Sequence, residues 1–159
     1  MTTLTVISVG ALKEDYYAAA VREYEKRLGA YCRVENVNLK EERIPDEESA
    51  AAVAAALEKE GERILAKIPA GAYTVAFCVE GEEMDSPALS RRVGQAVDRT
   101  GKVCFVIGSS HGLSPRVKRA ADLRLSVSRL TFPHRLMRVL VLEAAYRSYA
   151  ILAGSPYHK

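Results

Sequence analysis

The sequence predicts an α/β fold, with a mostly parallel five-stranded sheet and helices on both faces of it. Short segments with strand-like apolar patterns alternate with longer segments whose apolar residues recur at helical spacing, and such β-α alternation is typical of parallel sheets. The segment Tyr73–Val79 is apolar almost throughout, as expected for a strand that is covered on both faces. The chain contains no repeat or linker, so residues 1–159 are expected to form one domain.

Five segments have the length and composition of strands. The first two alternate apolar and polar residues, the next two are apolar runs, and the fifth follows a short helical segment. Between the second strand and the next helix, the acidic stretch Lys40–Glu48 is expected to be a surface loop, and Glu80–Asp85 is expected to be a turn. The predicted strands are Leu4–Val9, Arg33–Leu39, Tyr73–Val79, Val103–Ile107 and Leu123–Val127.

The helical segments carry recognisable start signals. Ser86 and Ser114 each precede a proline, and each is expected to cap a helix, because a serine side chain accepts a hydrogen bond from a free N–H group of the first turn. The last helix is apolar around most of its circumference, which is more than one small domain buries alone, and this predicts a homodimer. The longer predicted helices are Lys13–Leu28, Ser49–Ile68 and Pro133–Gly154.

The composition is that of an ordinary globular protein, with 48% hydrophobic and 27% charged residues. There is no signal-peptide pattern and no apolar run long enough for a bilayer, so no membrane partner is expected. The odd count of cysteines (Cys32, Cys78 and Cys104) argues against a disulfide framework and for a cytoplasmic location. The three histidines lack metal-ligand spacing, and no metal site is expected.

The basic residues are concentrated in the last third of the chain. From Val103 onward there are nine Lys or Arg residues and two acidic ones. Residues 1–102 contain fourteen Lys or Arg residues and eighteen acidic ones. A basic segment that also carries candidate ligand turns suits a phosphate-rich partner. The alternative is a basic, solvated face that binds no partner.

Two turns in this basic segment are candidate ligand sites. Gly108–Gly112 follows a predicted strand and precedes a helix, and Ser126–His134 follows the next strand. Ligands of open α/β sheets bind where strands end and helices begin, because free N–H groups point there. In the second turn, Leu130 and Phe132 would be exposed unless a flat ligand such as adenine covered them; alternatively, both side chains fill the core beneath the turn.

The first turn also matches G-x-S-x-G, the nucleophile motif of serine hydrolases, with Ser110 as the nucleophile. Asp122, followed by His134 or His158, appears downstream in the order of a catalytic triad. Serine hydrolysis is therefore an alternative function. Dinucleotide-binding and P-loop patterns are absent.

Several motifs together resemble the RlmH family of the SPOUT superfamily of methyltransferases. They are FVIG-S-S-x-GLS, L-S-x-S-x-x-TFPH, R-V-x-x-x-E and the terminal G-x-PYHK, with VISVGALKEDYYAAAVREYEKRL and GERILAKI nearer the start. The resemblance covers essentially the whole chain. It implies a homodimer with a C-terminal trefoil knot, S-adenosylmethionine as the cofactor, and methylation of N3 of pseudouridine 1915 in 23S rRNA, on free RNA or on the assembled ribosome.

The resemblance also implies the residues of the site. Ser109 departs from the family, which usually has a second glycine there; Leu130 replaces a usual methionine and Ala144 a usual glutamine. The cofactor contacts carried over from the family are Phe77, Gly108, Val127, Ser128, Arg129, Leu130, Thr131 and Phe132.

Methyl transfer from a sulfonium is an in-line displacement, so the main task of the site is to orient donor and acceptor. His158 is our candidate for a base or for a group that orients the acceptor, and Tyr157 is expected to place the acceptor ring. Arg129, Arg135 and Lys159 are expected to hold phosphates or an anionic ring. We further expect the C-terminal tail, Tyr157–Lys159, to complete the site of a partner subunit.

Two other interpretations remain. The tail could serve only to dock the chain end. The protein could also be a non-catalytic RNA-binding or ribosome-assembly protein, which would bind RNA with a steep salt dependence but transfer no methyl group.

Overall fold

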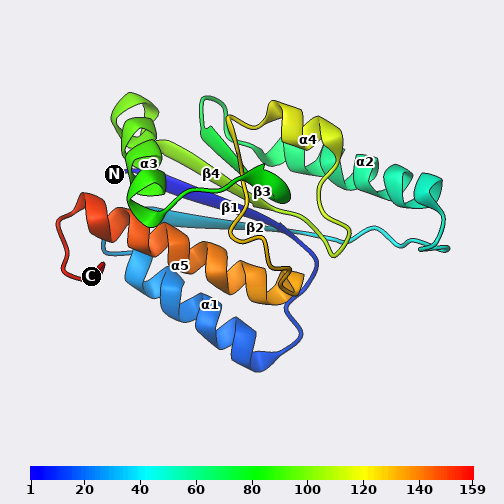
Figure 1. Ribbon diagram of the computed structural model, residues 1–159, viewed down its shortest axis with the longest axis horizontal. Helices are drawn as coiled ribbons and strands as arrows, with labels where there is room; N and C mark the ends of the chain where they lie inside the picture. The colour runs from blue at the N-terminus through cyan, green and yellow to red at the C-terminus, as the bar shows by residue number, and fades with distance from the viewer.

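The computed structural model describes residues 1–159 and contains one five-stranded sheet of strand order β2-β1-β4-β3-β5 (Figure 1). Every strand pair is parallel, which confirms the predicted α/β class and the number of strands. Because the strands are parallel, all their carboxyl ends lie at one edge of the sheet. The strands are β1 (Thr3–Val9), β2 (Arg33–Leu39), β3 (Tyr73–Glu82), β4 (Lys102–Ile107) and β5 (Leu123–Leu125).

Helices cover both faces of the sheet, as predicted. Successive strand residues point to opposite faces, so Val6 of β1 packs on one side and Ile7 on the other. The Val6 side is covered by α1, α3 and α5, and the Ile7 side by α2 and α4 (Figure 1). The helices are α1 (Asp15–Leu28), α2 (Ala50–Lys67), α3 (Ser86–Thr100), α4 (Pro115–Ala120) and α5 (His134–Leu152).

Helix α5 lies in the middle of its layer, in contact with both α1 and α3. Val141 and Ala145 are fully buried against the sheet, and the Ser148 carbonyl accepts a hydrogen bond of 2.8 Å from Ser90 of α3. Other apolar side chains of α5, among them Leu136 and Leu140, remain half-exposed. The helix is therefore the central support of this layer but leaves apolar surface uncovered.

Two element boundaries differ from the sequence prediction. Asp85, not Ser86, caps α3, because its carboxylate accepts a hydrogen bond of 2.8 Å from Ala88 N and Ser86 is already helical. Strand β5 ends at Leu125 instead of Val127. Beyond it, Ser126 N still donates to the Glu82 carbonyl of β3 at 2.9 Å, but the Ser126 hydroxyl donates to the Ser128 carbonyl at 3.0 Å, a local bond of the kind that competes with strand pairing. The predicted cap Ser114 is confirmed, with Val117 N donating to it at 3.2 Å.

Strand β3 does not end at Val79 but continues to Glu82 through a bulge. Leu125 of β5 pairs first with Phe77 and then with Glu82, so residues 78–81 are displaced from the ladder. Gly81 permits this, because a Cβ there would lie 2.6 Å from the Leu125 carbonyl carbon. The bulge leaves Val79 70% exposed beside the end of β5.

The cysteines are all free thiols. Burial raises the pKa of Cys32 to about 11 and that of Cys104 to about 12, so both are protonated at neutral pH and pack as small apolar groups. None of the helices combines the length and the apolarity that a bilayer span requires.

Candidate functional site

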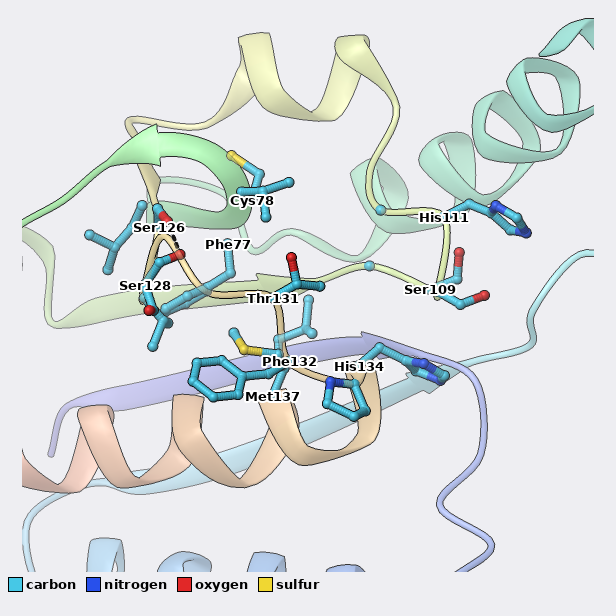
Figure 2. Close-up of a pocket in the computed structure, with 18 of the residues that line it drawn as sticks. Phe77, Cys78, Ser109, His111, Ser126, Ser128, Thr131, Phe132, His134 and Met137 are labelled. Carbon is cyan, nitrogen blue, oxygen red and sulfur yellow. Dashed lines mark hydrogen bonds between the residues drawn. The ribbon is translucent and has the colours of Figure 1, made fainter.

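A cleft of about 640 Å³ lies at the carboxyl ends of β3, β4 and β5, within the size range of small-molecule sites. Three segments that are distant in sequence form it: the end of β3, the turn after β4, and the segment between β5 and α5. Figure 2 shows Phe77, Ser109 and Thr131, one from each segment, directed around the same space. The strand order places these segments together, because β3 lies between β4 and β5.

The walls of the cleft combine apolar side chains with the backbone of the turns. Phe77 packs edge-on against Phe105 of the core, with ring centroids 5.2 Å apart, and this contact fixes one wall. Phe132 and Met137 lie together on the opposite side, beneath the segment that leads into α5 (Figure 2). No Lys, Arg, Asp or Glu side chain lines the cleft. Such a site suits a flat, largely uncharged ring whose polar edge is bound by backbone groups.

Seven of the eight cofactor contacts expected from the resemblance line this cleft. Leu130 is 72% exposed and Phe132 is half-exposed. The alternative that both side chains fill the core beneath the turn is therefore wrong. Arg129 is the exception, because its side chain is 90% exposed and its Nε lies 4.0 Å from the Glu83 carboxylate. The seven lining residues are Phe77, Gly108, Val127, Ser128, Leu130, Thr131 and Phe132.

The turn after β4 is held in a compact shape. A Cβ on Gly108 would lie 2.5 Å from the Gly112 carbonyl carbon, so only glycine fits this position without a backbone shift. Gly112 N donates to the Ser109 carbonyl at 2.9 Å and closes the turn. The Ser109 hydroxyl donates to Glu60 of α2 at 3.0 Å. The serine that departs from the family pattern therefore anchors the turn to α2.

Glu60 connects this turn to the acidic loop over residues 40–48. Its carboxylate is 4% exposed and accepts hydrogen bonds from Ser109 and, at 2.8 Å, from Glu42 N. A second contact joins the same segments, since the Ser110 hydroxyl donates to Glu41 at 3.3 Å. The acidic loop, expected to be merely a surface connection, thus supports one wall of the cleft.

We expect Ser109→Ala to lower the free energy of unfolding by about 1–3 kcal/mol, because it leaves a buried Glu60 oxygen without a donor. Urea unfolding measures this loss. Ser110→Ala is the matched control, since Ser110 is exposed, and its effect is expected to stay within about 0.5 kcal/mol. Equal effects of the two substitutions would contradict the assigned role of Ser109.

The C-terminal tail lies at the opposite end of α5 from the cleft. The 19 residues of α5 span about 28 Å, and the tail follows its far end (Figure 1). There the Tyr157 hydroxyl donates to Glu143 at 3.0 Å, and His158 Nδ1 lies 3.1 Å from Arg147 Nη1. The structure therefore does not bring Tyr157 or His158 to the cleft of their own chain.

The other predicted cationic residues are dispersed. Arg135, at the start of α5, is half-buried and pairs with Glu14 near α1. This ion pair engages Arg135 within its own chain. Lys159 is exposed at the chain end, beyond His158.

The residues of the alternative serine-hydrolase triad do not come together. Ser110 donates its hydroxyl hydrogen to Glu41. Asp122 lies before β5, at the amino-terminal edge of the sheet, where its carboxylate accepts a hydrogen bond of 2.8 Å from Thr74 N. The aspartate and the serine thus occupy opposite edges, and the geometry excludes a triad that joins them.

Sequence reasoning missed Met137, and it included His111 and His134 in the two predicted ligand turns without naming either as a cofactor contact. His134 and Met137 line it from the first turn of α5, and His111 lines it from the turn after β4. His134 belongs to the TFPH motif, which was the available signal, whereas nothing local marks Met137. No group of three or more His, Cys, Asp or Glu side chains that could hold a metal ion occurs in residues 1–159.

Comparisons with known proteins match the whole chain. A family model described as "Predicted SPOUT methyltransferase" matches residues 2–158. The protein named ribosomal RNA large subunit methyltransferase H from Streptococcus thermophilus (strain CNRZ 1066) is 44% identical over 155 residues, which cover 97% of this chain and 98% of that protein. The protein of the same name from Clostridium kluyveri (strain ATCC 8527) is 42% identical over 157 residues, covering 98% and 99%.

A solved structure has the same fold. The probable methyltransferase from Bordetella pertussis Tohama I superposes with a TM-score of 0.54 at 14% sequence identity, covering 93% of this chain and 96% of that one. The chain therefore has both close relatives in sequence and a more distant likeness in fold.

Proposed function

The chain belongs to the ribosomal RNA large subunit methyltransferase H family of SPOUT methyltransferases, and from this premise we propose that it methylates N3 of pseudouridine 1915 in 23S rRNA, with S-adenosylmethionine as the methyl donor. The observation that carries the proposal is the cleft of about 640 Å³ at the carboxyl ends of β3, β4 and β5. We propose that the enzyme acts in the cytoplasm, on the assembled ribosome. One small domain offers little surface for reading RNA sequence, so the ribosome would supply the remaining recognition.

The cleft fits the donor in size and chemistry. Phe77, Leu125 and Phe132 offer apolar surface to an adenine ring, while the turn at Gly108 presents backbone groups to its polar edge. The glycine at position 108 is required for the compact form of that turn. When bound, the donor supplies an electrophilic methyl group on sulfur. The residues of the chain bind and orient it, with Val127, Ser128, Leu130 and Thr131 forming the third wall.

We propose that the residues that hold the methyl acceptor come from a second subunit. Tyr157, His158 and Lys159 lie at the far end of α5 from the cleft of their own chain. The half-exposed apolar side chains of α5 suit burial against a second copy. In a two-fold homodimer, each tail can then reach the other subunit's cleft. There His158 and Tyr157 would orient the acceptor ring. Arg129 and Lys159 would hold phosphates, and Arg135 would do so after exchanging its ion pair with Glu14 for a phosphate.

The trefoil knot belongs to the same proposal. It would be formed by the segment between β5 and α5 together with the turn after β4, the two segments that line the cleft with β3. Knotting would keep these segments together without disulfides.

Two measurements test the proposal. Calorimetry is expected to find one S-adenosylmethionine bound per cleft, and a radiolabelled methyl group is expected to appear at one nucleotide of ribosomes that lack the modification. Free 23S rRNA serves as the comparison substrate and is expected to react more slowly. RNA binding with a steep salt dependence, but with no donor binding and no methyl transfer, would support the non-catalytic RNA-binding alternative instead.

A further inference from the structure

Two side chains of α5 and two of the tail that follows it form one hydrogen-bonded group. Glu143 Oε1 accepts from Arg147 Nε at 3.0 Å and from Arg147 Nη2 at 2.6 Å, and it also accepts from the Tyr157 hydroxyl at 3.0 Å. Burial, together with Glu143, raises the pKa of Tyr157 to about 12, so the phenol keeps its proton at neutral pH. The tail is thus docked on α5 by defined polar contacts.

Arg147 is the centre of this group. Its guanidinium lies over the Tyr157 ring, 4.6 Å from the centroid, while Glu143 binds two of its nitrogens. The third nitrogen, Nη1, lies 3.1 Å from His158 Nδ1. The contact with Glu143 and the contact with the ring leave the guanidinium little freedom, so Nη1 is held in place against the imidazole.

The chemistry of the two groups determines which one donates. A guanidinium has only N–H donors and keeps its charge in proteins, so His158 Nδ1 must be the acceptor in this contact. An imidazole nitrogen that accepts carries a lone pair and no hydrogen. The neutral ring must then carry its hydrogen on Nε2, the nitrogen that faces away from Arg147.

We propose that Arg147, held by Glu143, is a positioning residue that fixes His158 in the Nε2–H tautomer, so that His158 donates a hydrogen bond to the methyl acceptor instead of acting as its base. The inference rests on the proposed function and narrows the role of His158 within it. A base would have to take up a proton at Nε2, which already carries one, or at Nδ1, which Arg147 occupies. The proton of the acceptor N3 is then lost to a group other than His158.

Substitution of His158 distinguishes the two roles. The glutamine Nε2 lies at a similar distance from the backbone as the histidine Nε2 and donates a hydrogen bond, but it is not basic. His158→Gln therefore keeps the donor and removes the base. We expect the single-turnover rate to fall about tenfold in His158→Ala, the loss of one hydrogen bond, and only about threefold in His158→Gln. If His158 acted as the base, the single-turnover rate would fall at least about a hundredfold in both variants. Equal rates for the two variants would overturn the proposal.

The tautomer itself is measurable without any assay of activity. In the full-length protein, ¹⁵N NMR of the His158 ring is expected to report hydrogen on Nε2 alone, and a mixture of tautomers in Arg147→Met. Arg91→Met is the matched control, an exposed arginine of α3, and is expected to leave the spectrum unchanged. Hydrogen on Nδ1 in the wild-type protein would overturn the inference. If the tautomer is as stated but no RNA is methylated, the proposed reaction fails and the role of Arg147 as a positioning residue stands.

Discussion

Replacing Gly108 by alanine is expected to weaken S-adenosylmethionine binding about 5-fold to 150-fold, because overpacking at such a site costs about 1–3 kcal/mol. The new Cβ would lie 2.5 Å from the Gly112 carbonyl carbon and 3.0 Å from Leu113 Cγ. The first of these neighbours is backbone, so the turn after β4 must shift and the wall of the cleft moves with it. Calorimetric titration of the variant with the donor measures the loss.

Gly101→Ala is the matched control for this variant. Gly101 ends α3 with φ +69°, and no atom lies within 4 Å of the position that a Cβ would occupy. Alanine there is strained by about 1–2 kcal/mol but is remote from the cleft. We expect both variants to be less stable in thermal unfolding and only Gly108→Ala to lose donor affinity. If donor affinity survives in Gly108→Ala, the donor does not bind in this cleft.

At a donor concentration that saturates the wild-type protein but not Gly108→Ala, mixing two variants of low activity is expected to restore methyl transfer. One variant lacks the tail residues 157–159, and the other carries Gly108→Ala in an intact chain. In a mixed dimer, the intact cleft of the first subunit meets the intact tail of the second, while the other site of that dimer stays inactive. Random pairing therefore predicts about a quarter of the wild-type activity per subunit.

Each variant alone is the control for this experiment and, at the same donor concentration, is expected to stay well below the activity of the mixture at every protein concentration. Native mass spectrometry of the mixture reports whether mixed dimers have formed. If mixed dimers are present and activity is not restored, each site is built within one chain, and the tail would have to leave its contacts with Glu143 and Arg147 to reach its own cleft.

The comparison of sequence and structure is clearest at the segment between β5 and α5. Its motif predicted a ligand site, and the structure places this segment in the wall of the cleft, where the chain turns between β5 and α5. The pattern could not report that β5 stops at Leu125, since this depends on the Ser126 hydroxyl bonding to the Ser128 carbonyl. In the same way, the apolar run of β3 predicted a strand but not its bulge, which requires the close approach of Gly81 to Leu125.

Apolar periodicity and turn residues are local properties of the chain, so the sequence was enough to predict the order of strands and helices, the parallel sheet and two of the three segments that line the cleft. The third segment, at Phe77, was implied only by the resemblance to the RlmH family. The surroundings of those segments depend on how the chain folds. Ser109 meets Glu60 across 49 residues, and Asp122 is held at the opposite edge from Ser110. The docking of His158 on Arg147 likewise follows from the way the chain reverses after α5. Contacts of this kind depend on how packed elements meet in space, and no spacing along the chain encodes them.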